Sequence, residues 1–144
     1  PDIVIFLDRV AVKDTPATVQ LRFQAFHDDL AAELAASGTE FTITRPLASL
    51  LGRTASTGSL QVRTGRLALE DKDGIQPFAE VGSAAALEHE ILTVCSARPA
   101  GEAHGRLQIR LEGGSWKVTG TQAGRSIAVT LTPSAGNAAP QVAF

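Results

Sequence analysis

The sequence predicts a single α+β domain, in which a long N-terminal amphipathic helix packs on a curved, mostly antiparallel β-sheet. Residues 16–36 carry apolar side chains at helical spacing, and most of the chain after Gly38 alternates apolar with polar residues, as half-buried strands do. A chain of 144 residues is long enough for one domain with its own core. We expect that domain to span residues 1–132, and the Ala-, Gly- and Pro-rich residues 133–144 to form a loose tail.

The predicted helix runs from Pro16 to Ala36. Five of its apolar side chains would share one helical face: Val19, Phe23, Phe26, Leu30 and Leu34. Thr15 or Asp14 suits the N-cap, and Pro16 suits the first helical position. Gly38 can take the left-handed conformation that ends a helix.

Strands are predicted before and after this helix. Residues 2–10 contain an uninterrupted apolar run, which is typical of a strand covered on both faces. Residues 60–69 alternate on either side of Thr64-Gly65, which indicates a hairpin. Residues 106–119 form the clearest hairpin, with Gly113-Gly114 at its turn, and a further strand is expected at 127–131.

Three segments are harder to interpret. Residues 47–51 fit either a short helical turn or a packed loop, and the small, polar residues of Gly52–Gly58 indicate a flexible loop. Residues 83–95 fit a helix or a strand. We favour a helix in the first half, because Ala84-Ala85-Ala86 has high helix propensity, and strand from about Ile91.

Composition limits the classes of function. The net charge of -2 and the scarcity of aromatic residues count against nucleic-acid binding. No stretch approaches the roughly 20 apolar residues that span a bilayer, so no membrane association is expected. The single cysteine, Cys95, excludes a disulfide within the chain, and we expect a cytoplasmic protein.

Two histidines are the candidate catalytic residues. His27 would lie near the edge of the apolar helical face and could act as an acid or base if a strand residue met it. Its neighbours Asp28 and Asp29 would point in other directions around a helix. His89 lies between two glutamates, but no second histidine follows four residues later, so we expect no metal and no cofactor.

Charge is distributed unevenly along the chain. Residues 98–125 hold five basic and two acidic side chains, whereas residues 1–33 hold six acidic and three basic ones. The basic segment could therefore attract an acidic surface, including that of another copy. The expected protein-binding residues are Arg106, Arg110, Lys117 and, as the apolar tip of the tail, Phe144.

These observations favour a non-enzymatic binding or assembly protein, one that associates with itself or forms a subunit of a complex. The alternative is a small-molecule enzyme or ligand-binding domain. Its pocket would lie between helix and sheet, with His27 or His89 as the acid or base.

Overall fold

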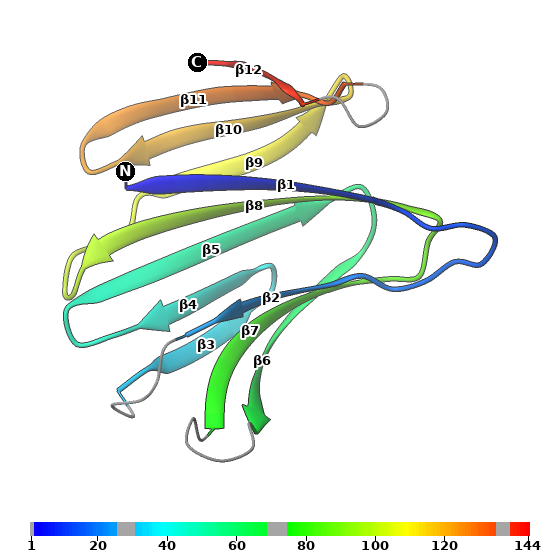
Figure 1. The fold of residues 1–144 in the computed structure, drawn as a ribbon. Coiled ribbons are helices and arrows are strands. Elements are labelled where there is room, and N and C mark those ends of the chain that lie inside the picture. Colours follow the sequence, from blue (N-terminus) through cyan, green and yellow to red (C-terminus); the bar gives the residue numbers. More distant parts are fainter. Residues whose placement is uncertain (1, 26–30, 69–74, 135–138) are drawn as a thin grey trace. The chain divides into compact units, whose positions relative to one another are not determined.

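The computed structural model describes residues 2–25, 31–68, 75–134 and 139–144 (Figure 1). Among the described residues, 71% lie in strands and none forms a helix. The predicted α+β fold with a long N-terminal helix is therefore wrong, and the protein is all-β. None of the described residues forms a helix that could cross a membrane.

The chain divides into two compact units, Pro1–Glu102 and Ala103–Phe144. In the first unit the described residues form two antiparallel sheets. The five-stranded sheet has the order β1-β8-β5-β4-β3 and the three-stranded sheet the order β2-β7-β6. The strands are β1 (Ile3–Ala11), β2 (Gln20–Gln24), β3 (Glu33–Ser37), β4 (Glu40–Thr44), β5 (Ala48–Ser56), β6 (Leu60–Ala68), β7 (Ile75–Ser83) and β8 (Glu88–Pro99).

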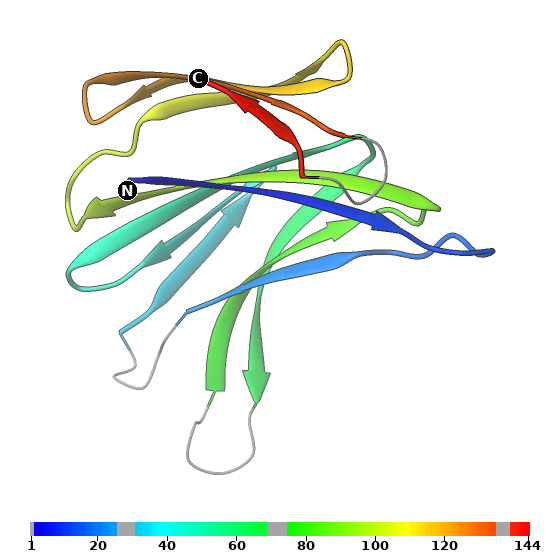
Figure 2. The ribbon, with the colours of Figure 1, turned by 45° about the horizontal axis from the view of Figure 1, so that its top comes forward.

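The two sheets of the first unit share one hydrophobic core. Figure 2 shows the strands of both sheets from a second direction. The buried residues of the core come from both sheets: Phe41, Val62, Ala79, Val81, Ile91 and Cys95. The ring of Phe23 on β2 lies 4.8 Å from that of Phe41 on β4 and 6.0 Å from that of Phe6 on β1. These aromatic contacts join the three-stranded sheet to the five-stranded one.

The segment predicted as a helix forms strands because a shorter period competes with the helical one. Val19, Leu21 and Phe23 alternate with Gln20, Arg22 and Gln24, and the apolar set packs against the core. This alternation lets β2 pair with β7, from Gln20 opposite Gly82 to Gln24 opposite Phe78. Leu34 lies on β3, and Phe26 and Leu30 lie outside the described residues.

Three other local predictions are also wrong. The segment 83–95 holds no helix, because β8 begins at Glu88 and is largely buried between β1 and β5. Gly52–Gly58 is not a loop throughout, since β5 continues to Ser56. Thr64-Gly65 is not a turn, since β6 runs unbroken from Leu60 to Ala68.

The described residues of the second unit form one antiparallel sheet with the order β12-β11-β10-β9. Its strands are β9 (Arg106–Glu112), β10 (Ser115–Gln122), β11 (Arg125–Thr132) and β12 (Gln141–Ala143). The predicted hairpin over 106–119 is confirmed, and Gly113 and Gly114 both have positive φ, as a type I′ turn requires. β12 lies within the segment expected to be a loose tail, and the expectation of one domain over 1–132 stays a prediction.

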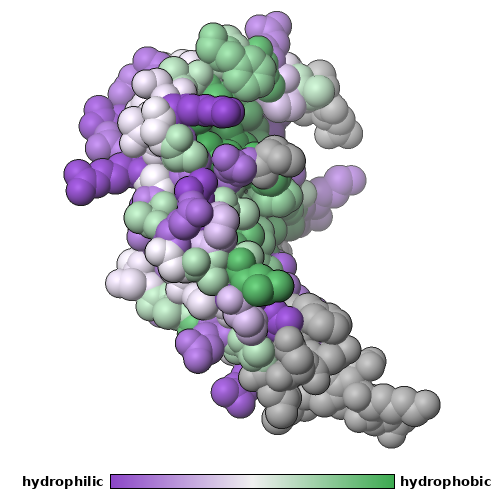
Figure 3. All heavy atoms as spheres, turned by 90° about the vertical axis from the view of Figure 1, so that its left-hand side faces the viewer, coloured by the Kyte–Doolittle hydropathy of each residue, from purple (hydrophilic) through white to green (hydrophobic). Residues whose placement is uncertain are grey.

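Apolar side chains reach the surface at scattered positions. Figure 3 shows one face of the molecule, on which hydrophobic side chains lie between hydrophilic ones. Leu47 and Phe144 are the most exposed large apolar residues among those described, and Val4 and Phe6 on β1 are also exposed. Single exposed apolar residues are common in proteins, so only a continuous set such as that on β1 suggests a binding surface.

Candidate functional site

The outer face of the three-stranded sheet carries an ordered set of polar side chains. Because Leu21, Phe23, Val62 and Val81 point to the core, their neighbours along each strand point outward. Strand pairing places these outward residues in three rows across β2, β7 and β6. The rows are Gln20–Gly82–Gln61, Arg22–Glu80–Arg63 and Gln24–Phe78–Gly65.

Glu80 is the centre of the middle row. Arg22 Nε donates a hydrogen bond to Glu80 Oε2 at 2.8 Å, and Arg63 donates to Oε1 from Nε at 2.8 Å and from Nη2 at 2.5 Å. The Glu80 side chain is only 2% exposed, because the two arginines cover it. The hydrogen bond from Arg22, followed by that from Arg63, holds the pKa of Glu80 below its ordinary value despite burial.

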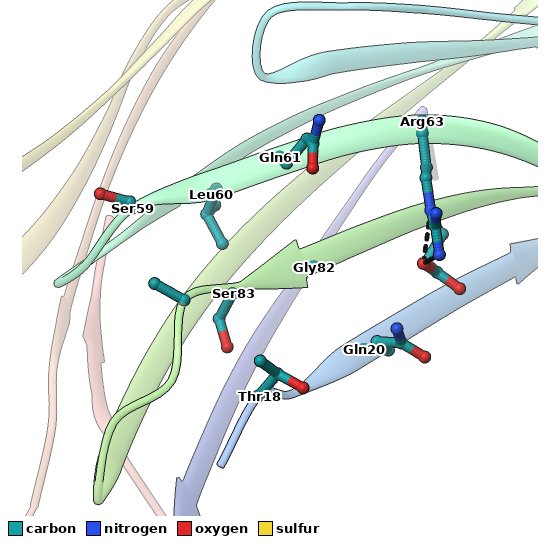
Figure 4. Close-up of a pocket in the computed structure, with 10 residues that line it drawn as sticks. Thr18, Gln20, Ser59, Leu60, Gln61, Arg63, Gly82 and Ser83 are labelled. Atoms are coloured by element: carbon teal, nitrogen blue, oxygen red, sulfur yellow. Dashed lines mark hydrogen bonds and ion pairs between the residues drawn. The ribbon is translucent and has the colours of Figure 1, made fainter. Parts of the chain in front are cut away.

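A cavity of about 370 Å³ lies beside this row, over Gly82. Figure 4 shows Gln20 and Gln61 on either side of Gly82, with Arg63 towards one end and Ser59 and Thr18 towards the other. A Cβ added at Gly82 would meet only Gln61 O, at 3.8 Å, so the missing side chain leaves open space. We call this cavity the Gly82 hollow.

His89, the predicted acid or base, is buried at the start of β8. Its Nε2 lies 3.1 Å from Ala86 O, which can only accept, so Nε2 carries a hydrogen. In the neutral ring, Nδ1 then accepts the hydroxyl hydrogen of Ser83 at 3.0 Å. Ser83 Oγ also accepts from Val19 N–H at 2.9 Å, so the pair connects the residue before β2, the end of β7 and the start of β8.

The Ser83–His89 pair lines a smaller cavity of about 190 Å³. A serine hydroxyl that donates to histidine is the arrangement found where histidine activates a nucleophile. Here both ring nitrogens have protein partners, which suits a role in holding the connection between β7 and β8. Acid or base catalysis by His89 stays a prediction, and His27, with Asp28 and Asp29, lies outside the described residues.

The predicted protein-binding residues lie in the second unit. Arg106 and Arg110 on β9 share a face with Lys117 on β10, and Arg110 is directly opposite Lys117. Lys117 Nζ donates to Glu112 Oε2 at 2.7 Å. Phe144 is 98% exposed. The structure therefore brings the three basic residues together on one face of the hairpin, and their binding role stays a prediction.

Two further kinds of site, a reactive cysteine and a metal centre, find no support among the described residues. Cys95 is buried in the core, and desolvation raises the pKa of its thiol to about 11, which disfavours the reactive thiolate. Within the described ranges, no three His, Cys, Asp or Glu side chains gather as metal ligands would.

The outward rows were not recognised from the sequence, although a signal for them exists. Gln, Arg and Gln alternate at 20, 22 and 24, and Gln and Arg recur at 61 and 63. Such alternation indicates polar strand faces, but their alignment depends on pairing with Glu80 and Gly82, which are far away in sequence.

Replacing Glu80 by glutamine should lower the free energy of unfolding by about 1–2 kcal/mol, because two guanidinium groups would then lose their shared counter-charge. The loss is smaller than for a deeply buried pair, since both arginines reach solvent. The pKa of Glu80 is lowered in the folded protein, so its contribution is present above the ordinary value of 4.5 and lost as pH falls through the folded value. Urea unfolding at neutral and acidic pH measures both effects.

The matched control is Glu112→Gln. Glu112 forms an exposed pair with Lys117, in which both side chains are nearly half exposed, so this change should alter stability little. Equal stability of E80Q and E112Q at neutral pH would contradict the role assigned to Glu80.

A scan against protein-family models and a search of curated proteins found no match for this chain.

Proposed function

We propose that this protein is a non-enzymatic assembly protein that associates with a second copy of itself through the edge of β1 that faces away from β8, an edge with which no described strand pairs. The observation that carries the proposal is that β1 is an apolar strand at the end of its sheet. Pairing with β8 occupies one side of β1 along its whole length, from Ile3 opposite Ser96 to Ala11 opposite Glu88.

The direction of the backbone hydrogen bonds would allow a strand of a second copy to pair with this edge of β1. Ala97 N donates to Asp2 O at 2.9 Å, and Val12 N donates to Leu87 O at 2.8 Å, so even-numbered residues bond towards β8. Because antiparallel pairs alternate, Ile3, Ile5 and Leu7 turn their N–H and C=O groups to the other side. These groups suit pairing with an added strand.

The side chains of residues 3–7, in the first half of β1, carry no charge that would oppose such pairing. Residues 3–7 are all apolar, and Val4 and Phe6 are 45% and 43% exposed. Natural edge strands usually carry lysine, proline or a bulge that prevents association. The absence of these features over residues 3–7 favours a β1 that is covered in the working assembly.

A second copy suits this edge because the strand is compatible with itself. A twofold axis through Phe6 would place Ile5 opposite Leu7 of the other copy and Val4 opposite its Asp8. No like charges would then face each other across the pair. An axis through Ile5 would instead oppose Asp2 and Asp8, so charge selects among the possible registers.

Replacing Val4 by glutamate should convert a dimer into a monomer, because in the register centred on Phe6 the added carboxylate would face Asp8 of the other copy. Light scattering coupled to size-exclusion chromatography measures the mass. Leu47→Glu is the matched control, since Leu47 is also apolar and exposed but lies between β4 and β5. We expect L47E to remain dimeric.

A parent protein that is monomeric at high concentration would overturn the proposal, as would a dimeric V4E. Salt distinguishes this surface from the predicted basic one. Association through Arg106, Arg110 and Lys117 would weaken as salt rises, whereas apolar strand pairing would not.

A cytoplasmic location belongs to the same proposal. It is supported by a single, buried cysteine, which needs no oxidising compartment. The enzyme alternative with His27 or His89 is supported only by the Ser83–His89 hydrogen bond.

A further inference from the structure

We propose that the Gly82 hollow binds a sugar acid, a small polyhydroxylated molecule that carries a carboxylate. The inference uses residues of the three-stranded sheet and is independent of association through β1. It rests on three features of the hollow: its volume, the excess of positive charge beside it and the hydrogen-bonding groups of its lining.

The space is the right size and is not required by the fold. A volume of about 370 Å³ lies in the range of small-ligand sites. Gly82 has no positive φ, so its backbone does not require glycine, and a Cβ there would make only an ordinary contact. Backbone strain therefore does not require glycine at this position, and the missing side chain leaves the hollow open.

The charge favours an anion. Arg22 and Arg63 share the single carboxylate of Glu80, so the row keeps one net positive charge. Arg63 uses Nε and Nη2 for Glu80, which leaves its Nη1 hydrogens for another acceptor. The Arg63 side chain is 61% exposed and borders the hollow, so a ligand carboxylate can reach it.

The remaining lining favours hydroxyl groups on the ligand. Gln20 and Gln61 each present an amide that donates and accepts, and Thr18 and Ser59 add hydroxyls. Neighbouring hydroxyls of a sugar also donate and accept. The described lining has no aromatic ring on which a neutral sugar could stack, so the hydroxyl contacts need the charged contact with Arg63 beside them for measurable binding.

Binding of D-glucuronate to the whole chain, measured by NMR titration, tests this proposal. D-glucose serves as the neutral counterpart and acetate as the carboxylate without hydroxyls. We expect glucuronate to bind at millimolar concentrations and about tenfold more tightly than either of the other two, because only glucuronate combines both kinds of contact.

Two variants locate the binding. Gly82→Val places a branched side chain that suits a strand in the middle of the hollow, and Arg63→Gln removes the guanidinium group, so each should weaken glucuronate binding about tenfold. Gln24→Ala is the control, because Gln24 lies on the same outer face but does not line the hollow. Thermal melting confirms that each variant is folded.

The proposal would be overturned by absence of glucuronate binding, by equal binding of glucose or acetate, or by unchanged binding in a folded G82V. If R63Q unfolds, G82V still decides the location.

Discussion

Replacing Gly120 by alanine should destabilise the sheet of the second unit by about 3–5 kcal/mol. Gly120 has a φ of 140°, which side chains with a Cβ rarely adopt. An added Cβ would also fall on the carbonyl oxygen of Arg106, in the neighbouring strand β9. Neither backbone can move without breaking the pairing of β9 with β10. Trp116 is the single tryptophan, is 1% exposed and lies on β10, so its fluorescence during urea unfolding measures the loss.

Gly113→Ala is the matched control for this prediction. Gly113 also has positive φ, but a Cβ there would meet nothing within 4 Å. We expect a cost of only about 1–2 kcal/mol, the cost of the left-handed backbone alone. Equal losses in G120A and G113A would show that the contact with Arg106 adds nothing.

Replacing Gly52 by valine should destabilise the first unit by about 2–4 kcal/mol. Gly52 on β5 is directly opposite Phe41 on β4, and the Phe41 ring covers it so closely that a Cβ would overlap the ring. Phe41 is 1% exposed within the core and cannot swing into solvent without leaving a void. Urea unfolding followed by circular dichroism measures the change.

Cys95 provides a second readout of the Gly52 change, since it pairs directly with Gly52 across β5 and β8. Burial keeps the thiol protonated and unreactive in the intact core, so faster labelling by a thiol reagent would report opening at this point. Gly58→Val is the control, because a Cβ at Gly58 would meet nothing within 4 Å. If G52V and G58V were equally stable, tight packing of Phe41 on Gly52 would be excluded.

The sequence predicted correctly those elements that depend on near neighbours. The hairpin over 106–119 was predictable because Gly113-Gly114 supplies the turn that its two alternating strands require. The strand predicted at residues 2–10 was also correct. Its apolar run, however, belongs to the last strand of a sheet, and none of its side chains is fully buried as in a strand covered on both faces.

The errors share a physical cause. Residues 16–36 satisfy a helical period and, over Val19 to Gln24, a strand period as well, and pairing with β7 decides between them. That partner is distant in the sequence, so local propensity could not reveal it. The candidate site was missed for the same reason, since each of its rows joins three strands.

The pairing of β1 with β8 also has a consequence for how the chain is made. Ile3 meets Ser96, so the ribosome must add most of the first unit before β1 finds its partner. At roughly 5–20 residues per second, the apolar segment 3–7 waits for several seconds outside the ribosome without its neighbour. During translation this apolar segment therefore stays unpaired for longer than the segments whose partners are close in sequence, which exposes it to contact with other nascent chains.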